Sequence, residues 1–483
     1  MNDRVANRLI LAVVALDHLR FVAVDGRVPP DLGLFYDPLP ALWADYDPWS
    51  LAHTGGWYAS LLLLLFRIFG LGTVAFQLPA LISVLVVVWC AGRLGGARAA
   101  ALAAAIPMVW VQGRVGWIHV PEAALLLSAL TAWRADPELI RPRSGVGIAV
   151  LGALAVALRP SAVGWVALLG IAVGVRAGRR VVLPALVWVI ASAPAAWEAQ
   201  GYLAAKLAAR ERYAIDVPAL LVQVPLTIGF VPGLTVLFGL VALRRAAVDR
   251  LLATWALVPM VLFVGFRAGI DNFTTGVVAL VILAAPGLDR YGRIADVGPL
   301  LSLTLAVLVQ WVPSPAPGST VARVAGMLSL PAQDNLKNYA RPHTGWGAED
   351  IRALVDESCR GRPCRIGVGQ GLFRPHGEDP GRFETFLSGL DGVELADLRD
   401  RAGPPMGLDA VVSWECPDGD GPWFRRFPSA RGNVQMAIRS AEMRPVLTRQ
   451  IDPGCAVTWW RADRPPRTPA PAHERRGPRG APR

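Results

Sequence analysis

Charged side chains are scarce in this sequence. Only 18% of its 483 residues are Asp, Glu, Lys or Arg, whereas 53% are hydrophobic and the mean hydropathy is +0.41. A soluble domain carries ~25% charged residues, so this composition excludes an ordinary soluble globular protein. The hydrophobic residues form long blocks between Leu9 and Val312, and the sequence becomes polar and mixed after Pro313. Because a bilayer core ~30 Å thick needs about 20 helical residues, we predict a polytopic α-helical membrane bundle.

Acidic residues are fewer than basic ones, and the formal net charge is +11. The Arg residues lie mostly between the apolar blocks and in a Pro-rich C-terminal tail. This distribution is typical of membrane topology signals. We therefore predict the lipid bilayer as a partner and no nucleic acid. No small-residue cleavage site follows the first apolar run, so no cleavable signal peptide is predicted.

About eleven membrane spans account for the apolar blocks. They cover Leu9–Val24, Ala75–Gly92, Ala99–Val111, Trp117–Trp133, Val146–Leu158, Ala162–Val175, Val181–Trp197, Pro218–Leu243, Leu251–Phe266, Ile270–Leu288 and Val297–Trp311. The run Trp57–Phe69 is apolar but short, and we predict a helix that lies in the membrane interface without crossing.

The basic residues between these spans predict the orientation of the chain. With the N-terminus inside, fifteen Arg residues fall on the cytoplasmic side in tight clusters, and nine basic residues fall outside. This asymmetry agrees with the positive-inside rule. The protein is therefore predicted to be integral to the cytoplasmic membrane, with everything after Trp311 exported.

The composition divides the chain into four regions. They are a transmembrane bundle over 1–312 with an external acidic loop at 25–56, a linker at 313–336, a small exported α/β domain at 337–463, and a disordered basic tail at 464–483. Within the α/β domain, helices are predicted over 349–359 and 382–390, and strands over 365–368, 410–414 and 456–461.

Cysteine is rare, with five residues in the chain. Cys90 lies alone in a membrane segment, where a small buried side chain is the default expectation. The other four, Cys359, Cys364, Cys416 and Cys455, all fall in the exported domain. An even number in an oxidising compartment predicts at least one disulfide. A zinc site is disfavoured, because the Cys-x4-Cys spacing has no His pair close by.

Carboxylates and cations collect on the predicted external face. The catalytic candidates are Asp17, Asp25 and Asp31; the phosphate-binding candidates are Arg114, Arg159 and Arg267; further cavity candidates are His18, Asp37, His53, His119 and Glu122. Sugar transfer from a lipid-linked donor needs a carboxylate to deprotonate the acceptor hydroxyl or to hold a divalent metal ion. It also needs cations beside the leaving phosphate. Taken singly, each Arg could instead be an interface anchor.

Several short motifs follow one another in a familiar order. They are His53-Thr54-Gly55-Gly56-Trp57-Tyr58 at the end of the acidic loop, Phe69-Gly70, Phe76-Gln77-Leu78-Pro79, Arg114 followed by His119 and Glu122, and Leu158-Arg159-Pro160-Ser161. This order resembles the GT-C superfamily of membrane glycosyltransferases, in particular the aminoarabinose, galacturonosyl and protein mannosyl transferase branch. The sequence departs from the family pattern at Gly55-Gly56, at Gln77, and at His119 and Glu122, where an Asp is usual.

The resemblance implies a membrane glycosyltransferase that moves a hexosyl or pentosyl group from a polyprenyl-phosphate sugar to a lipid, glycan or protein acceptor of the cell envelope. It implies a catalytic carboxylate near the first span, which is Asp17, Asp25 or Asp31. A transporter or flippase of a lipid-linked envelope precursor is the alternative; it predicts related halves, and the sequence contains no convincing internal repeat. A protein that only anchors its exported domain would need a single span.

Overall fold

The computed structural model describes two compact units of the chain, one formed mainly by residues 1–347 and one mainly by 348–483. The described residues are 3–19, 22, 56–69, 74–115, 118–193, 228–244, 248–266, 274–311, 348–359, 362–368, 392–398, 407–415, 428–451 and 455–463. Most of the predicted external loop 25–56, the linker and the tail lie outside this part of the chain.

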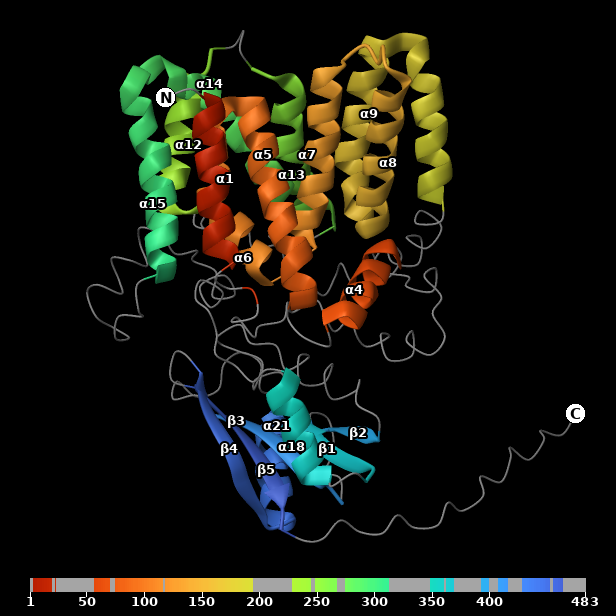
Figure 1. Cartoon of the computed structure of the whole chain (residues 1–483), viewed down its shortest axis with the longest axis vertical. Helices are drawn as coiled ribbons and strands as arrows, with labels where there is room; N and C mark the ends of the chain where they lie inside the picture. The colour runs from red at the N-terminus through yellow and green to blue at the C-terminus, as the bar shows by residue number, and fades with distance from the viewer. Residues whose placement is uncertain are drawn as a thin grey trace, which may run out of the picture. The chain divides into compact units, whose positions relative to one another are not determined.

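The first unit is a bundle of helices (Figure 1). Its described α-helices are α1 (Asp3–Leu19), α4 (Gly56–Phe69), α5 (Val74–Ala105), α6 (Pro107–Val115), α7 (His119–Ala135), α8 (Pro142–Leu158), α9 (Val163–Ala177), α12 (Phe230–Ala242), α13 (Arg250–Phe266), α14 (Thr274–Leu288) and α15 (Val297–Trp311), with 3-10 turns η1 (Pro160–Ala162), η2 (Gly178–Val181) and η6 (Asp289–Asp296). Residues 182–193 are also helical. Helix α4 lies obliquely at one end of the bundle (Figure 1), as a helix predicted not to cross would.

Within the described residues, three continuous helical stretches are long and apolar enough to cross a membrane: Gln77–Ala105, Pro160–Ala193 and Thr274–Leu308. Each contains a glycine with positive φ, namely Gly96 (77°), Gly178 (57°) and Gly292 (58°). Residues with a side chain rarely adopt this conformation, so these glycines mark breaks between successive helices.

Packing contacts show that the chain reverses at two of these breaks. A Cβ at Gly113 would collide with the Val84 side chain, so α6 returns alongside the first half of α5. Gly152 on α8 faces both Val166 and Trp188, whereas Gly145 faces Pro184. The helix of residues 182–193 therefore runs in the same direction as α8 and opposite to α9. Each long stretch around Gly96 and Gly178 is thus a helix pair, as the predicted spans require.

Small residues let the central helices approach closely. Gly239 on α12 packs against the Ala284 backbone on α14, where an added Cβ would lie 2.5 Å from the Ala284 carbonyl oxygen. Close approach over small residues is the usual way in which membrane helices pack. Large apolar side chains such as Ile171, Val175 and Phe238 are exposed on outer helices. A bilayer would cover these outward faces, because lipid tails are as apolar as the side chains.

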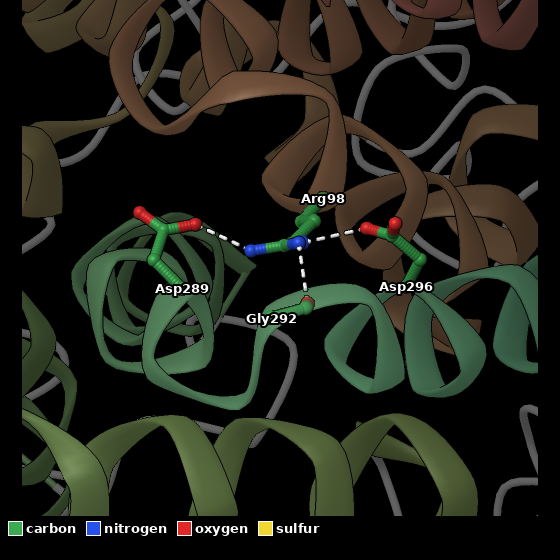
Figure 2. A network of polar contacts seen from close by, with 4 residues as sticks. All are labelled: Arg98, Asp289, Gly292 and Asp296. Atoms are coloured by element: carbon green, nitrogen blue, oxygen red, sulfur yellow. Dashed lines mark hydrogen bonds and ion pairs between the residues drawn. The ribbon is translucent and has the colours of Figure 1, made fainter. Parts of the chain in front are cut away.

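Loops that were assigned to the cytoplasmic side contact one another. Arg98 on the α5 reversal binds Asp289, Asp296 and the Gly292 carbonyl oxygen on η6 (Figure 2). In the last turn of α7, Arg134 pairs with Asp249, and Arg180 donates a hydrogen bond to the Glu138 carbonyl oxygen in the loop that follows α7. These loops therefore share one end of the bundle, as the charge pattern predicts; which end faces the cytoplasm stays a prediction.

The second unit is an α/β domain with a five-stranded sheet in the order β2-β1-β3-β5-β4. Its elements are α18 (Ala348–Cys359), β1 (Cys364–Val368), β2 (Val393–Asp397), β3 (Ala410–Glu415), α21 (Pro428–Ser440), β4 (Met443–Ile451) and β5 (Cys455–Ala462). Strands β1, β2 and β3 are parallel, and β5 pairs antiparallel with β3 and β4. Leu398, Leu408 and Val411 form its apolar core with Val434 and Ala437 of α21.

Helix α18 and strands β1, β3 and β5 lie where the sequence pattern predicts them. The predicted helix over 382–390 lies outside the described residues. Strands β2 and β4 and helix α21 were not predicted. Their sequences explain this, because two of the five residues of β2 are acidic, β4 contains a proline with two arginines, and α21 contains a glycine.

A disulfide joins Cys359 at the end of α18 to Cys364 at the start of β1, with Cα atoms 5.2 Å apart. The prediction of at least one disulfide in this domain is therefore confirmed in the structure. Cys416 lies outside the described residues, and the side chain of Cys455 is not described. Cys90 is a free, buried cysteine, as expected.

Candidate active site at one end of the bundle

A buried cluster of three polar side chains forms where α7 begins and α8 ends. His119 and Glu122 lie one turn apart in the first turn of α7, so they share one face of that helix. Arg159 follows the last residue of α8 in an extended conformation, with φ −149° and ψ 122°. The next residue is Pro160, and a proline disfavours helical geometry in the residue before it. The proline therefore ends α8 and directs the Arg159 backbone out of the helix.

Arg159 uses one nitrogen for both partners. Its Nη1 atom donates to Glu122 Oε2 at 3.0 Å and also contacts His119 Nδ1. A guanidinium has no acceptor, so His119 Nδ1 must accept this hydrogen bond. His119 is therefore neutral in this arrangement, with its proton on Nε2. The two contacts hold the guanidinium plane in one orientation.

The cluster is shielded from solvent on most sides. The side chains of Glu122 and His119 are 3% and 4% exposed, whereas that of Arg159 is 14% exposed. Two polar atoms in this region, Glu122 Oε1 and Ser161 Oγ, are buried without a hydrogen-bond partner among the described residues. Buried polar atoms are nearly always paired in folded proteins. These two atoms therefore mark a place where a ligand or water would complete the hydrogen bonding.

A second pair of polar residues ends α1. Asp17 and His18 are both buried, and His18 Nδ1 donates to the Val14 carbonyl oxygen at 3.0 Å. A Cβ at Gly113 on α6 would lie 3.6 Å from His18 Nε2, so α6 packs closely beside the imidazole. An acid and an imidazole buried at the end of a membrane helix are costly and indicate function.

An apolar cavity of about 310 Å³ lies between α4, α5 and α7. Leu61 and Leu65 line it from α4, Pro79 and Ile82 from α5, and Leu125 from α7. Pro121 also lines it and directly precedes Glu122 in the sequence, so α7 contributes residues both to the cavity and to the polar cluster. Its apolar lining suits a hydrocarbon ligand.

Tyr58 contributes a phenol to the wall of this cavity. Burial raises the pKa of Tyr58, which lies on α4, the helix predicted not to cross the membrane, so the side chain stays a neutral hydroxyl. In the sequence, Tyr58 is the last residue of the motif that begins at His53, but the motif by itself does not indicate that Tyr58 lines a cavity.

The structure brings together three of the predicted site residues: Arg159, His119 and Glu122. Asp17 and His18 are buried near the end of α1, and their functional role stays a prediction. Arg114 lies on α6, but its side chain is not described. The remaining candidates, Asp25, Asp31, Asp37, His53 and Arg267, lie outside the described residues. Within the described part of the chain, no three His, Cys, Asp or Glu side chains gather to hold a metal ion. The divalent metal suggested for the loop acids stays a prediction.

Comparison with known proteins identifies the fold. No family model matches the chain, and no curated protein sequence matches it. Among solved structures, ArnT from Cupriavidus metallidurans in the apo state is 14% identical and superimposes over 93% of this chain and 97% of its own, with a TM-score of 0.53. The same protein bound to undecaprenyl phosphate gives 16% identity, the same coverage and a TM-score of 0.50.

The mycobacterial arabinofuranosyltransferase AftD matches 97% of this chain at 15% identity and a TM-score of 0.52. This chain spans 40% of the length of that AftD chain. The structure thus shares its fold with ArnT and AftD.

Proposed function

We propose that this protein is a membrane glycosyltransferase. It moves a hexosyl or pentosyl group from a polyprenyl-phosphate donor to a lipid, glycan or protein acceptor of the cell envelope. It does so on the external face of the cytoplasmic membrane, where its C-terminal α/β domain is exported. The observation that carries this proposal is the largely buried Arg159 guanidinium, held by Glu122 and His119 in a bundle whose helix α7 also lines an apolar cavity. A polyprenyl phosphate needs these two environments next to each other.

Arg159 is the residue we assign to the donor phosphate. When the bond between the sugar and the phosphate breaks, negative charge grows on the phosphate oxygens. A guanidinium that is already oriented stabilises this charge without reorganising, and charge-assisted hydrogen bonds to phosphate are strong. Glu122 and His119 supply the orientation. The structure of ArnT with undecaprenyl phosphate, which shares this fold, supports a donor of this class.

The apolar cavity is the part of the site we assign to the isoprenoid tail. Small-molecule pockets usually measure ~300–1,000 Å³, so a cavity of about 310 Å³ would receive only a short part of a long tail. The remainder of the tail would extend into the bilayer along the exposed apolar helix faces.

A carboxylate is assigned to the acceptor. It takes the proton from the acceptor hydroxyl as the oxygen attacks the anomeric carbon opposite the phosphate, which inverts the configuration. Asp17 is the candidate within the described residues, and its burial beside His18 supports it. Asp25 and Asp31 are the alternatives in the loop.

The experiment is an assay of sugar transfer with the full-length protein in lipid nanodiscs. Polyprenyl-phosphate pentoses and hexoses are supplied with a membrane extract as the acceptor, and released polyprenyl phosphate is quantified by chromatography. We expect release with the wild type and its loss in Asp17→Asn or in a loop variant, Asp25→Asn or Asp31→Asn. If intact donor instead crosses the bilayer of a proteoliposome without bond cleavage, the protein is a flippase and the proposal is wrong.

A further inference from the structure

The charges of the Arg159 cluster cancel. Arg159 carries one positive charge and Glu122 one negative charge, and His119 is neutral because its Nδ1 atom accepts from Arg159. Glu122 is almost completely buried, so water screens its charge poorly. Any anion that binds the Arg159 guanidinium would therefore sense a nearby negative charge as well as the positive one.

The proposed reaction changes the charge of the lipid carrier. The donor is a phosphodiester with one negative charge. During transfer, the bond between the anomeric carbon and the phosphate oxygen breaks, and its electron pair stays on that oxygen. The new bond forms to the acceptor oxygen, whose proton moves to the catalytic carboxylate. The carrier leaves as a phosphomonoester, which carries close to two negative charges above its second pKa of about 6.

We infer that Glu122 makes this site distinguish the donor from the spent carrier by charge. This inference rests on the proposed function, because it assumes that Arg159 binds the phosphate. The single negative charge of the diester is attracted by Arg159, and this attraction outweighs its repulsion by Glu122. The second charge of the monoester meets the Glu122 carboxylate across the same guanidinium, with the unpartnered Oε1 atom adding no compensation from the described residues. Glu122 thereby weakens retention of the product and favours its release.

A purely orienting role for Glu122 makes a different prediction. In that case its oxygen matters as a hydrogen-bond acceptor for Arg159 Nη1, and its charge does not. Glutamine has the same length and keeps a carbonyl oxygen that can accept this bond. The substitution Glu122→Gln therefore removes the charge and keeps the acceptor, which separates the two roles.

The test compares two ligands that differ by one charge: undecaprenyl phosphate and its methyl ester, undecaprenyl methyl phosphate. Their dissociation constants are measured at pH 8 with the full-length protein in phosphatidylcholine nanodiscs. We expect Glu122→Gln to tighten the binding of undecaprenyl phosphate about tenfold relative to the methyl ester. The reason is that the Glu122 carboxylate repels the second charge of the phosphate, and water screens this repulsion poorly in a buried site. Glu122→Asp keeps the charge and should keep the wild-type ratio.

Glu138→Gln is the matched control. Glu138 lies just after the C-terminal end of α7, away from the Arg159 cluster, and is exposed. In this variant the ratio of the two dissociation constants should therefore equal that of the wild type. An unchanged ratio in Glu122→Gln would overturn the inference, as would an equal loss of affinity for both ligands, which would make Glu122 an orienting residue. If Arg159→Met binds both ligands as tightly as the wild type, the phosphate site itself is misassigned and the proposed function loses its support. Thermal unfolding of each variant shows whether it is folded.

Discussion

The two ends of the helical bundle use the same residue types in opposite ways. At one end, Arg98 binds Asp289 and Asp296, whose side chains are 72% and 63% exposed. At the other end, Arg159 binds Glu122, whose side chain is 3% exposed. Exposed ion pairs contribute little because water screens them. A buried pair costs much desolvation energy and becomes strongly unfavourable when one partner is lost. The first arrangement joins two loops, whereas the second maintains a charged group that a ligand can use.

The largest effect on stability should come from breaking the buried pair. Arg159→Met keeps the length of the side chain but leaves the Glu122 carboxylate buried and unpaired. Removing one partner of a buried pair typically destabilises a protein by about 3–5 kcal/mol. We expect a clear fall in the midpoint of thermal unfolding of the detergent-solubilised protein. The double variant Arg159→Met/Glu122→Gln should recover most of it, and a double variant no more stable than Arg159→Met would contradict the argument.

A smaller effect should follow at the opposite end, where Gly96 breaks α5. Its backbone has φ 77° and ψ −175°, a region that is almost restricted to glycine. Gly96→Ala should therefore cost about 1–3 kcal/mol of unfolding free energy, although the new methyl group would meet no atom closer than 3.9 Å.

Gly147 on α8 is the matched control for Gly96. A Cβ there would meet nothing within 4 Å, and its φ lies in the ordinary range. Alanine is favoured over glycine in a helix by up to ~1 kcal/mol, so Gly147→Ala should leave the midpoint unchanged or raise it. Equal losses in both variants would show that the positive φ of Gly96 is not what makes alanine costly at that position.

Loss of the exposed ion pairs of Arg98 should lower the unfolding free energy less than Arg159→Met or Gly96→Ala does. Arg98→Ala removes contacts to Asp289 and Asp296 and one hydrogen bond of 3.0 Å to the Gly292 carbonyl oxygen. Exposed pairs contribute about 0–1 kcal/mol each, and 1 M salt should remove most of the difference from the wild type. Sugar transfer should stay within a few-fold of the wild type. A loss of transfer as large as that of Arg159→Met would abolish the contrast between the two ends.

The smallest predicted effect is local and depends on pH. Asp136, directly after α7, accepts hydrogen bonds from the backbone N–H groups of Arg141 and Ile140 at 3.0 and 2.9 Å. The Arg141 hydrogen bond first, and then that of Ile140, holds the pKa of Asp136 below its ordinary value. Because the folded pKa is lowered, this stabilisation is complete above the ordinary pKa and is lost as the pH falls through the lowered one.

Hydrogen exchange of the Ile140 and Arg141 amides measures this effect. After correction for intrinsic rates, their protection should fall in acid and stay constant near neutral pH. Asp136→Asn should lower it near neutral pH and remove its dependence on pH in the acid range. Protection that is independent of pH in the wild type would show that the carboxylate is not what orders this turn.

The sequence alone predicts most of the helical bundle, because hydrophobicity is a local property of the chain. The blocks Val146–Leu158, Leu251–Phe266 and Val297–Trp311 coincide closely with α8, α13 and α15. The α/β domain is predicted less completely. Strand β2 is held by pairing with β1, which lies about 25 residues earlier in the chain, and β4 is held by pairing with β5, which follows it. Their own composition therefore carries little signal.

The candidate site is likewise predicted in part by the sequence and decided in part by the tertiary structure. Composition and charge asymmetry by themselves determine that this chain is a membrane protein, and the order of short motifs indicates its fold. Those patterns leave Arg159 as one of several arginines that could simply anchor in the interface. Only the tertiary structure distinguishes it, because its partners His119 and Glu122 lie 40 and 37 residues away in the sequence. Burial and pairing across antiparallel helices depend on how α7 and α8 meet, and no local pattern in either helix records that contact.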